Sequence, residues 1–158
     1  ESPMAIDDMK EVMAGMEYVR RDAAVRAGLA ATPEAAAQAS PRVALIAPPV
    51  AYKTLAGTEI AAEDYNIAVR VASMENIHRA VQVTGAMSIS AGLVVEGTLL
   101  NEMAVNLDTK GDLKIGNPSG VLATRADARK NADGSWNLVS TSAYRTFRRI
   151  MDGHVYHP

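Results

Sequence analysis

Residues 84–95 read Thr-Gly-Ala-Met-Ser-Ile-Ser-Ala-Gly-Leu-Val-Val, a run that is apolar on nearly every side and dense in small side chains. A helix without a polar face has to be buried on all sides to be stable in water. Small side chains also let surrounding strands approach the helix closely. We therefore predict a central helix over these residues, threaded through a curved sheet and ending near Gly97.

Most of the remaining chain has the pattern of strands and turns. Residues 65–73 alternate with period two and are rich in β-branched side chains, which is typical of a strand. Asp133-Gly134 supplies the positive φ that a hairpin turn needs. By the same reasoning we predict further strands over residues 42–47, 103–108, 113–115, 121–128, 136–148 and 155–157.

The N-terminal part carries the second predicted helix. Residues 6–31 place apolar side chains at three- and four-residue spacings, and Gly28 is the candidate for the helix stop. Residues 32–41, Thr-Pro-Glu-Ala-Ala-Ala-Gln-Ala-Ser-Pro, have low complexity, and we interpret them as an internal linker. Two helices in a β-rich pattern indicate an α+β class, and 158 residues are enough for a single domain.

Composition excludes several classes of protein. The net charge of −2 and the pI of about 5.9 argue against a nucleic-acid partner. No apolar run reaches the roughly 18 residues that a membrane span needs. The absence of cysteine excludes disulfides, thiolate nucleophiles and Cys-ligated metals, and it fits a cytoplasmic protein. The start at Glu1 has no signal-peptide pattern, and we expect it to be the boundary of a longer chain.

Thr84, Gly85 and Ala86 stand where the central helix should begin. Free backbone N–H groups and the helix dipole make such a point suitable for an anion. Gly85 has no side chain to block close approach, and Thr84 can cap the helix or donate a hydrogen bond. The alternative is ordinary N-capping, with glycine present for packing.

A second candidate is the stretch Gly116-Asn117-Pro118-Ser119-Gly120, which joins two predicted strands. Two glycines and a proline favour a fixed, exposed turn. Asn117, Ser119 and Gly120 could then offer hydrogen bonds to a carboxylate or amide ligand. The alternative is a plain five-residue connection between strands.

His78 lies shortly before the central helix, with Ser73 and Asn76 close by in the sequence. It is a candidate ligand-binding residue, although a single histidine is more often a satisfied structural residue. His154 and His157 are three residues apart on a predicted strand, so their side chains do not share a face. We therefore predict no metal site.

Taken together, these residues make the chain similar to the C-terminal half of the PrpF family. The resemblance is collinear and spans nearly the whole chain. It rests on residues 23–29, 44–52, 70–78, 83–86, 114–121 and 145–158.

The resemblance implies a diaminopimelate-epimerase-like fold, in which two similar domains each wrap a mixed sheet around a central buried helix. It implies a cofactor-free proton shift on an unsaturated di- or tricarboxylate, as in 2-methylaconitate cis–trans isomerases and 4-oxalomesaconate tautomerases. The implied substrate-binding residues are Ser73, His78, Thr84, Gly85, Ala86, Asn117, Ser119 and Gly120. The catalytic lysine and cysteine are expected in a missing N-terminal half, so no residue here is assigned as base or acid.

Two departures from the family pattern bear on function. Members often carry a cysteine soon after the Thr-Gly-Ala motif, where residues 86–90 here contain none, and many have histidine at the position of Asn117. We expect the chain to be inactive without its N-terminal domain and to bind a carboxylate substrate, either alone or as a homo-oligomer. The alternatives are a non-catalytic binding or assembly module, and another epimerase or racemase of the same fold.

Overall fold

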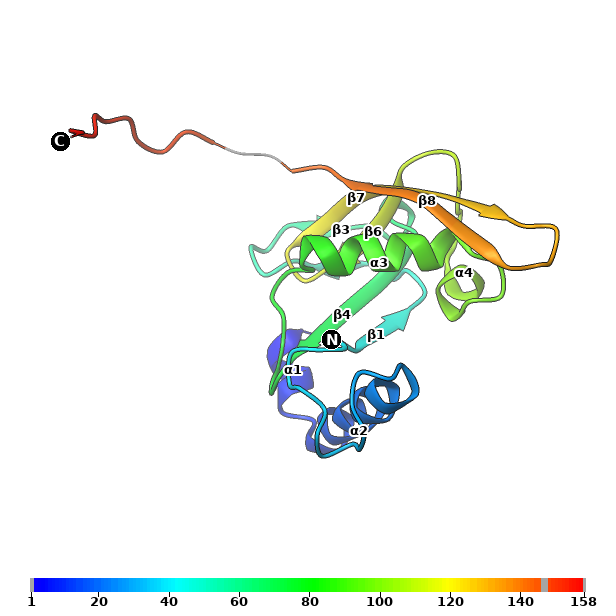
Figure 1. Ribbon diagram of the computed structural model, residues 1–158. Helices are drawn as coiled ribbons and strands as arrows, with labels where there is room; N and C mark the ends of the chain where they lie inside the picture. Colours follow the sequence, from blue (N-terminus) through cyan, green and yellow to red (C-terminus); the bar gives the residue numbers. More distant parts are fainter. Residues whose placement is uncertain (1, 146–147, 158) are drawn as a thin grey trace.

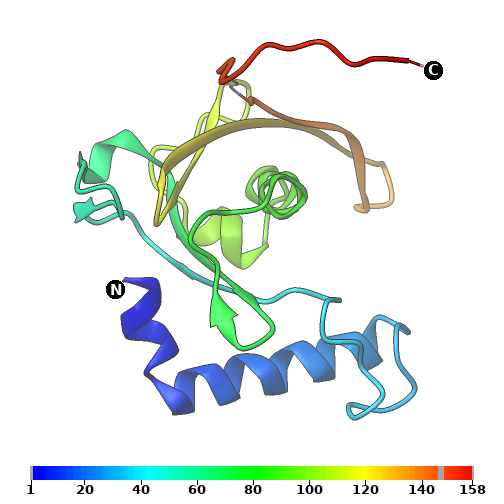
Figure 2. The same cartoon turned by 90° about the vertical axis from the view of Figure 1, so that its left-hand side faces the viewer.

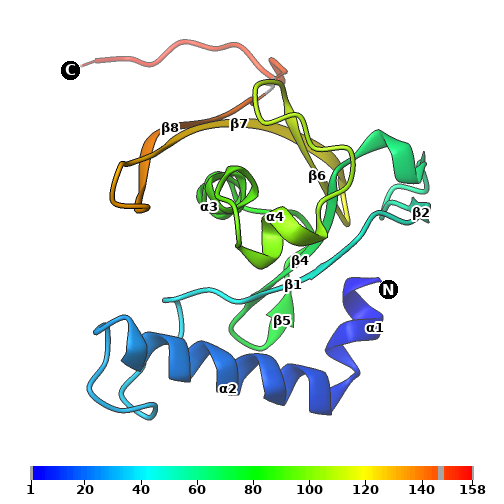
Figure 3. The ribbon, with the colours of Figure 1, turned by 90° about the vertical axis from the view of Figure 1, so that its right-hand side faces the viewer.

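The computed structural model describes residues 2–145 and 148–157, and helix α3 (Val83–Val94) lies at its centre. A curved sheet passes around this helix, which is seen nearly end-on in Figures 2 and 3. The predicted central helix is thus confirmed to within one residue at each end. The elements in chain order are α1 (Pro3–Asp7), α2 (Lys10–Arg26), β1 (Ala44–Ala47), β2 (Tyr52–Lys53), β3 (Glu59–Ile60), the 3₁₀ helix η1 (Ala62–Asp64), β4 (Ile67–Ser73), β5 (Asn76–Ile77), α3, α4 (Leu99–Met103), β6 (Leu113–Asn117), β7 (Gly120–Lys130) and β8 (Trp136–Ala143).

The main sheet is mixed, in the order β1-β4-β6-β7-β8, with β5 paired to β4. The β4–β6 pair is parallel and the other pairs are antiparallel (Figure 1). Alternate residues of β4, namely Ile67, Val69 and Val71, share one buried cluster with Ile89 and Leu93 of α3. The class is therefore α+β with a mixed sheet, as predicted.

Two buried hydroxyls connect α3 to the sheet. Ser90 Oγ lies 2.6 Å from Thr124 Oγ1 of β7 and 2.7 Å from the Ala86 carbonyl oxygen. Thr124 in turn donates a 3.0 Å hydrogen bond to the Leu113 carbonyl of β6. Both residues are fully buried, so these contacts satisfy polar groups that water cannot reach.

One side of α3 is open, in contrast to the predicted burial on all sides. Ala86, Ile89, Ser90, Leu93 and Val94 are buried, whereas the side chains of Thr84 and Ser88 are exposed. The sheet is curved but unclosed, since β1 and β8 form its two edges. The gap between these edges leaves part of the helix uncovered.

The N-terminal helix is shorter than predicted and broken near its start. α1 ends at Asp7 because the Asp7 carboxylate accepts a 2.6 Å hydrogen bond from the Ile77 N–H of β5. α2 ends at Arg26, and Gly28 has the predicted role in the stop. Its φ is +69°, and the N–H groups of Gly28 and Leu29 bond to the carbonyls of Val25 and Ala24, which is a Schellman motif.

Residues 32–41 contain turns but no helix or strand, and they lie against α2. The buried Arg20 side chain donates a 2.5 Å hydrogen bond to the Ala37 carbonyl and is ion-paired with Glu17. The segment is therefore attached to the helix at this point.

The strand predicted over residues 103–108 is wrong. Its first residue ends α4, and the remainder is loop. Thr98 caps α4 by accepting a hydrogen bond from the Asn101 N–H, and the Asn101 side chain donates to the Leu93 carbonyl at the end of α3. These contacts fix α4 before the predicted strand, and the buried Asn66 side chain donates to the carbonyls of Val105 and Asn106, which holds this part of the segment as a loop.

The strand predicted over residues 136–148 ends at Ala143, and residues 146 and 147 lie outside the described residues. Residues 148–157 have no regular structure, so the predicted strand 155–157 is also wrong. This segment extends away from the domain in Figure 1. Within the described residues, no helix is long and apolar enough to span a membrane.

Candidate carboxylate-binding site

The turn between β6 and β7 is tighter than the predicted five-residue connection. Gly116 and Asn117 belong to β6 and Gly120 begins β7, so Pro118 and Ser119 alone make the turn. The buried Asn117 side chain accepts a 3.1 Å hydrogen bond from the Ser119 N–H. Gly120 has a φ of +137°, which favours glycine. The exposed group of this turn is the side chain of Ser119.

Tyr52 and Tyr65 pack against the β6–β7 turn. The Tyr52 hydroxyl lies 2.9 Å from the carbonyl oxygens of both Asn117 and Gly120. The ring of Tyr65 meets that of Tyr52 edge-on at 5.7 Å and covers Gly116, where an added Cβ would lie 2.5 Å from ring carbons. Gly116 is therefore needed for close packing, and the turn has little freedom to move.

The turn is bonded directly to the segment that leads into α3. Ser119 Oγ donates a 2.6 Å hydrogen bond to the Arg79 carbonyl oxygen, four residues before the helix starts at Val83. The two predicted anion-binding motifs are therefore held at the same end of the domain.

The first turn of α3 offers unbonded backbone donors. The N–H groups of Val83, Thr84 and Gly85 have no acceptor among the residues that the structure describes. The N–H of Ala86 is already bonded to the Gln82 carbonyl, and the Ala86 side chain is fully buried. Thr84 is exposed, and the missing side chain of Gly85 leaves its amide open to approach.

Ser73 and His78 meet through a residue that the sequence did not single out. One terminal nitrogen of the Arg42 guanidinium lies 3.1 Å from Ser73 Oγ and 3.2 Å from His78 Nε2. The Gln82 side chain, which belongs to the N-cap residue of α3, contacts the same His78 nitrogen. A continuous row of contacts therefore runs from the end of β4 to the start of α3.

His78 is held in its neutral form. The pKa of His78 lies below its ordinary value of 6.5, mainly because partial burial disfavours the charged imidazolium. The nearby positive charge of Arg42 lowers the pKa further. At neutral pH the imidazole is therefore an acceptor towards Arg42.

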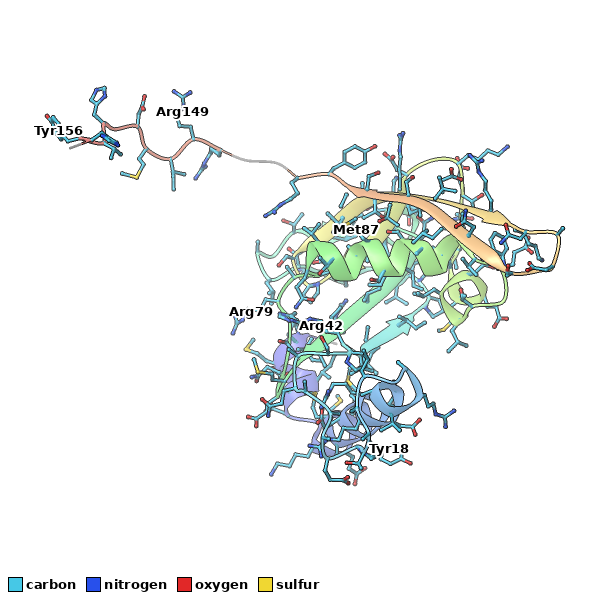
Figure 4. All side chains as sticks on the ribbon, in the orientation of Figure 1. Tyr18, Arg42, Arg79, Met87, Arg149 and Tyr156 are labelled. Atoms are coloured by element: carbon cyan, nitrogen blue, oxygen red, sulfur yellow. The ribbon has the colours of Figure 1, made fainter. Side chains whose placement is uncertain are left out.

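Positive charge gathers at this end of α3. Figure 4 shows Arg42 and Arg79 near the end at which the helix begins. Within the described part of the chain, neither guanidinium has a carboxylate oxygen within 4.0 Å. With the open amides of the first helical turn, these charges form an environment suited to a carboxylate.

Five of the predicted site residues lie at one end of the domain: Ser73, His78, Thr84, Gly85 and Ser119. The other three predicted residues have structural positions, since Asn117 and Gly120 build the turn and Ala86 packs in the core. Arg42 and Arg79 were not predicted from the sequence. Among residues 2–145 and 148–157, no three His, Asp or Glu side chains are grouped to hold a metal.

Comparison with known proteins identifies relatives over nearly the whole chain. The PrpF protein family matches residues 1–158. A 2-methyl-aconitate isomerase of Shewanella oneidensis is 34% identical over 97% of this chain and 38% of its own length. A 3-methylitaconate isomerase of Eubacterium barkeri is 27% identical over 99% of this chain and 41% of its own length.

A solved structure shows the same arrangement of elements. The crystal structure of a methylitaconate-delta-isomerase superposes with a TM-score of 0.83 at 26% identity, over 98% of this chain and 40% of that one. The chain thus spans about two fifths of the length of these relatives. The family match over residues 1–158 shows that this chain belongs to the PrpF protein family.

Proposed function

We propose that this chain is the C-terminal, substrate-binding domain of a cofactor-independent isomerase with a diaminopimelate-epimerase-like fold. Its substrate would be an unsaturated di- or tricarboxylate such as 2-methylaconitate or 4-oxalomesaconate. The observation that carries the proposal is the group of open amides in the first turn of α3, at the end of the domain where the Ser119 turn also lies. The Ser119–Arg79 hydrogen bond holds this turn against the segment that enters the helix.

The names of the relatives support an isomerase. 2-Methylaconitate and 3-methylitaconate are both unsaturated polycarboxylates, and the relatives named for them cover this chain almost completely. The chain spans about two fifths of their length, which leaves room for a second domain in the whole protein.

The proposed reaction is a proton shift. A base removes a proton from a carbon next to the double bond, and the electron pair delocalises into the system conjugated with a carboxylate. An acid then returns a proton, to another carbon or after rotation about the weakened double bond. No atom is gained or lost. The first turn of α3 would stabilise the negative charge that develops on the carboxylate oxygens.

The base and the acid are assigned to the second domain. This chain contains no cysteine, and His78 is occupied as the acceptor of Arg42. A half cleft also leaves the substrate in water, where charge stabilisation is weak. The second domain would close over the α3 end and complete the site.

Exchange of substrate protons in D₂O tests this proposal. Residues 1–158 alone should incorporate no deuterium into 2-methylaconitate above a buffer control, whereas the full-length protein should incorporate it rapidly. Deuterium incorporation by the 158-residue chain alone, or its absence with the full-length protein, would contradict the proposed division of roles.

The absence of cysteine favours a second candidate, a non-catalytic binding module of the same fold. Such a module would bind a tricarboxylate at the α3 end without promoting exchange in any form of the protein. The same measurement with the full-length protein separates the two candidates. Sedimentation of each form would show whether either one self-associates.

A further inference from the structure

Arg42 is held by neutral side chains rather than by an acid. The residue precedes β1, and its guanidinium meets Ser73 and His78, which are 31 and 36 residues away in the sequence. A guanidinium has only N–H donors, so the contacted His78 Nε2 must be the unprotonated ring nitrogen. The imidazole proton then belongs on Nδ1, and neither partner neutralises the arginine.

Most other arginines of the described chain are paired differently. Arg20, Arg21, Arg26, Arg125, Arg129 and Arg149 each have a carboxylate oxygen within 4.0 Å. The exposed Arg42 instead keeps its full charge while two side chains fix one of its terminal nitrogens. A solvated surface arginine would gain little from being held in this way.

The geometry points to Arg42 as a carboxylate-binding residue of the α3 site, oriented by Ser73 and His78. This inference rests on the proposed function and adds a second anchor to it. One carboxylate of the ligand would lie on the first turn of α3, and another would lie on the free edge of the Arg42 guanidinium. A planar fork can bind a carboxylate through two parallel hydrogen bonds, which a lysine cannot do.

The position of Arg42 suits this role. His78 contacts both Arg42 and Gln82, and Gln82 is the N-cap residue of α3. The guanidinium is thus connected through one imidazole to the start of the helix. In Figure 4, Arg42 is labelled below the end at which α3 begins. The site would therefore select ligands with at least two carboxylates over those with one.

The test is a titration of isotope-labelled residues 1–158 with tricarballylate, a saturated tricarboxylate, and with acetate, followed at the Gly85 amide by NMR. We expect Arg42→Gln to weaken tricarballylate binding by roughly tenfold or more, since a charge-assisted bidentate contact is lost. The acetate-induced shift at Gly85 should not change. Arg42→Lys should restore only part of the affinity. Arg26→Gln, which removes an equal charge from α2, should have no effect.

A second readout checks the orienting role of His78. Imidazole ¹⁵N spectra of the free protein should show the proton on Nδ1 and an unprotonated Nε2. Ser73→Ala should weaken tricarballylate binding less than Arg42→Gln does, without affecting acetate.

Unchanged tricarballylate affinity in Arg42→Gln would overturn the inference while leaving the proposed function intact. Equal loss of the acetate shift would also overturn it, because Arg42 would then be a structural residue. Full tricarballylate affinity in Arg42→Lys would exclude a bidentate contact between the guanidinium and a carboxylate. Absence of any shift at Gly85 in the unmodified protein would overturn both the inference and the proposed carboxylate site. Deuterium exchange by the full-length protein would then still decide whether the full-length protein is an isomerase.

Discussion

The Ser119 hydroxyl donates a 2.6 Å hydrogen bond to the carbonyl oxygen of Arg79, forty residues earlier in the chain. This bond ties the β6–β7 turn to the segment that enters α3. Both motifs of the candidate site therefore depend on a contact between residues that are distant in the sequence.

Ser119→Ala should weaken ligand binding while it lowers the free energy of unfolding only slightly. The bond is at an exposed position, so its loss costs about 0.5–1.5 kcal/mol in the free energy of unfolding. Ser135→Ala, which removes an exposed 2.6 Å hydrogen bond to Asp133 and a 2.9 Å hydrogen bond from Asn131 in the β7–β8 hairpin, is the control. Urea unfolding should show a loss of stability for both variants, and tricarballylate titration should show a loss of affinity for Ser119→Ala alone. Equal affinities in the two variants would contradict this expectation.

Gly85→Ala should impair ligand binding with little effect on stability, whereas Gly116→Ala should lower stability. Gly85→Ala meets only ordinary contacts, at 3.5 Å from the Gln82 side-chain oxygen, so stability should change by less than about 1 kcal/mol. The added methyl group should nevertheless hinder a carboxylate at the first turn of α3. Gly116→Ala would place its Cβ 2.5 Å from the Tyr65 ring and should destabilise by about 1–3 kcal/mol. Urea unfolding and tricarballylate titration check both changes, and unaltered binding by Gly85→Ala would argue against the site.

The Glu17–Arg20 pair should make the free energy of unfolding depend on pH in the acid range. Hydrogen bonds from the Arg20 side chain hold the pKa of Glu17 at about 2, below its ordinary value of 4.5. The unfolded chain therefore takes up the proton first as the pH falls. The stabilisation is fully present above pH 4.5 and is lost as the pH falls towards 2.

Glu17→Gln should accordingly lower stability at pH 7 by about 1.5–3 kcal/mol, because it weakens hydrogen bonds to a nearly buried guanidinium. The difference from the unmodified protein should shrink as the pH approaches 2. Asp22→Gln, which affects the exposed Arg26 pair on the same helix, should have a much smaller effect. A pH-independent difference would show that the ion pair is not its cause.

His78 should titrate below pH 6.5 in the folded protein. Arg42 and Gln82 both contact its Nε2, and partial burial is the main cause of the lowered pKa. Since the unfolded chain protonates first, this group's contribution to stability is present above pH 6.5 and is lost as the pH falls through the folded pKa. In Arg42→Gln the pKa should rise towards 6.5 but stay below it, because burial remains. An NMR titration of the imidazole that showed no rise would contradict the contact.

Local sequence was sufficient for the elements that have one dominant signal. The small apolar side chains of residues 84–95 identified α3, and Gly28 and the Asp133-Gly134 pair marked a helix stop and a hairpin. Each of these features depends on neighbours within a few residues.

The features that were missed depend on distant partners. α4 forms because Asn101 reaches back to the end of α3, and α1 ends where Asp7 bonds to β5, 70 residues away. The buried Asn66 donates to the carbonyls of Val105 and Asn106, which fixes the loop predicted as a strand. Arg42 was missed for the same reason, since Ser73 and His78 meet it only through the β1–β4 pairing.

The hydrogen bond between the Ser90 and Thr124 hydroxyls fixes the rotation of α3 about its own axis. A helix with small apolar side chains on most sides could settle at several azimuths about its own axis at similar energy. Only one azimuth brings the Ser90 oxygen to within 2.6 Å of the Thr124 oxygen, and at any other azimuth these two buried hydroxyls would lose this contact and keep only their bonds to main-chain carbonyls. The face of the first turn of α3 that points outward, and thus the set of amides that a ligand meets, is set by a core residue of β7 that lies away from the site.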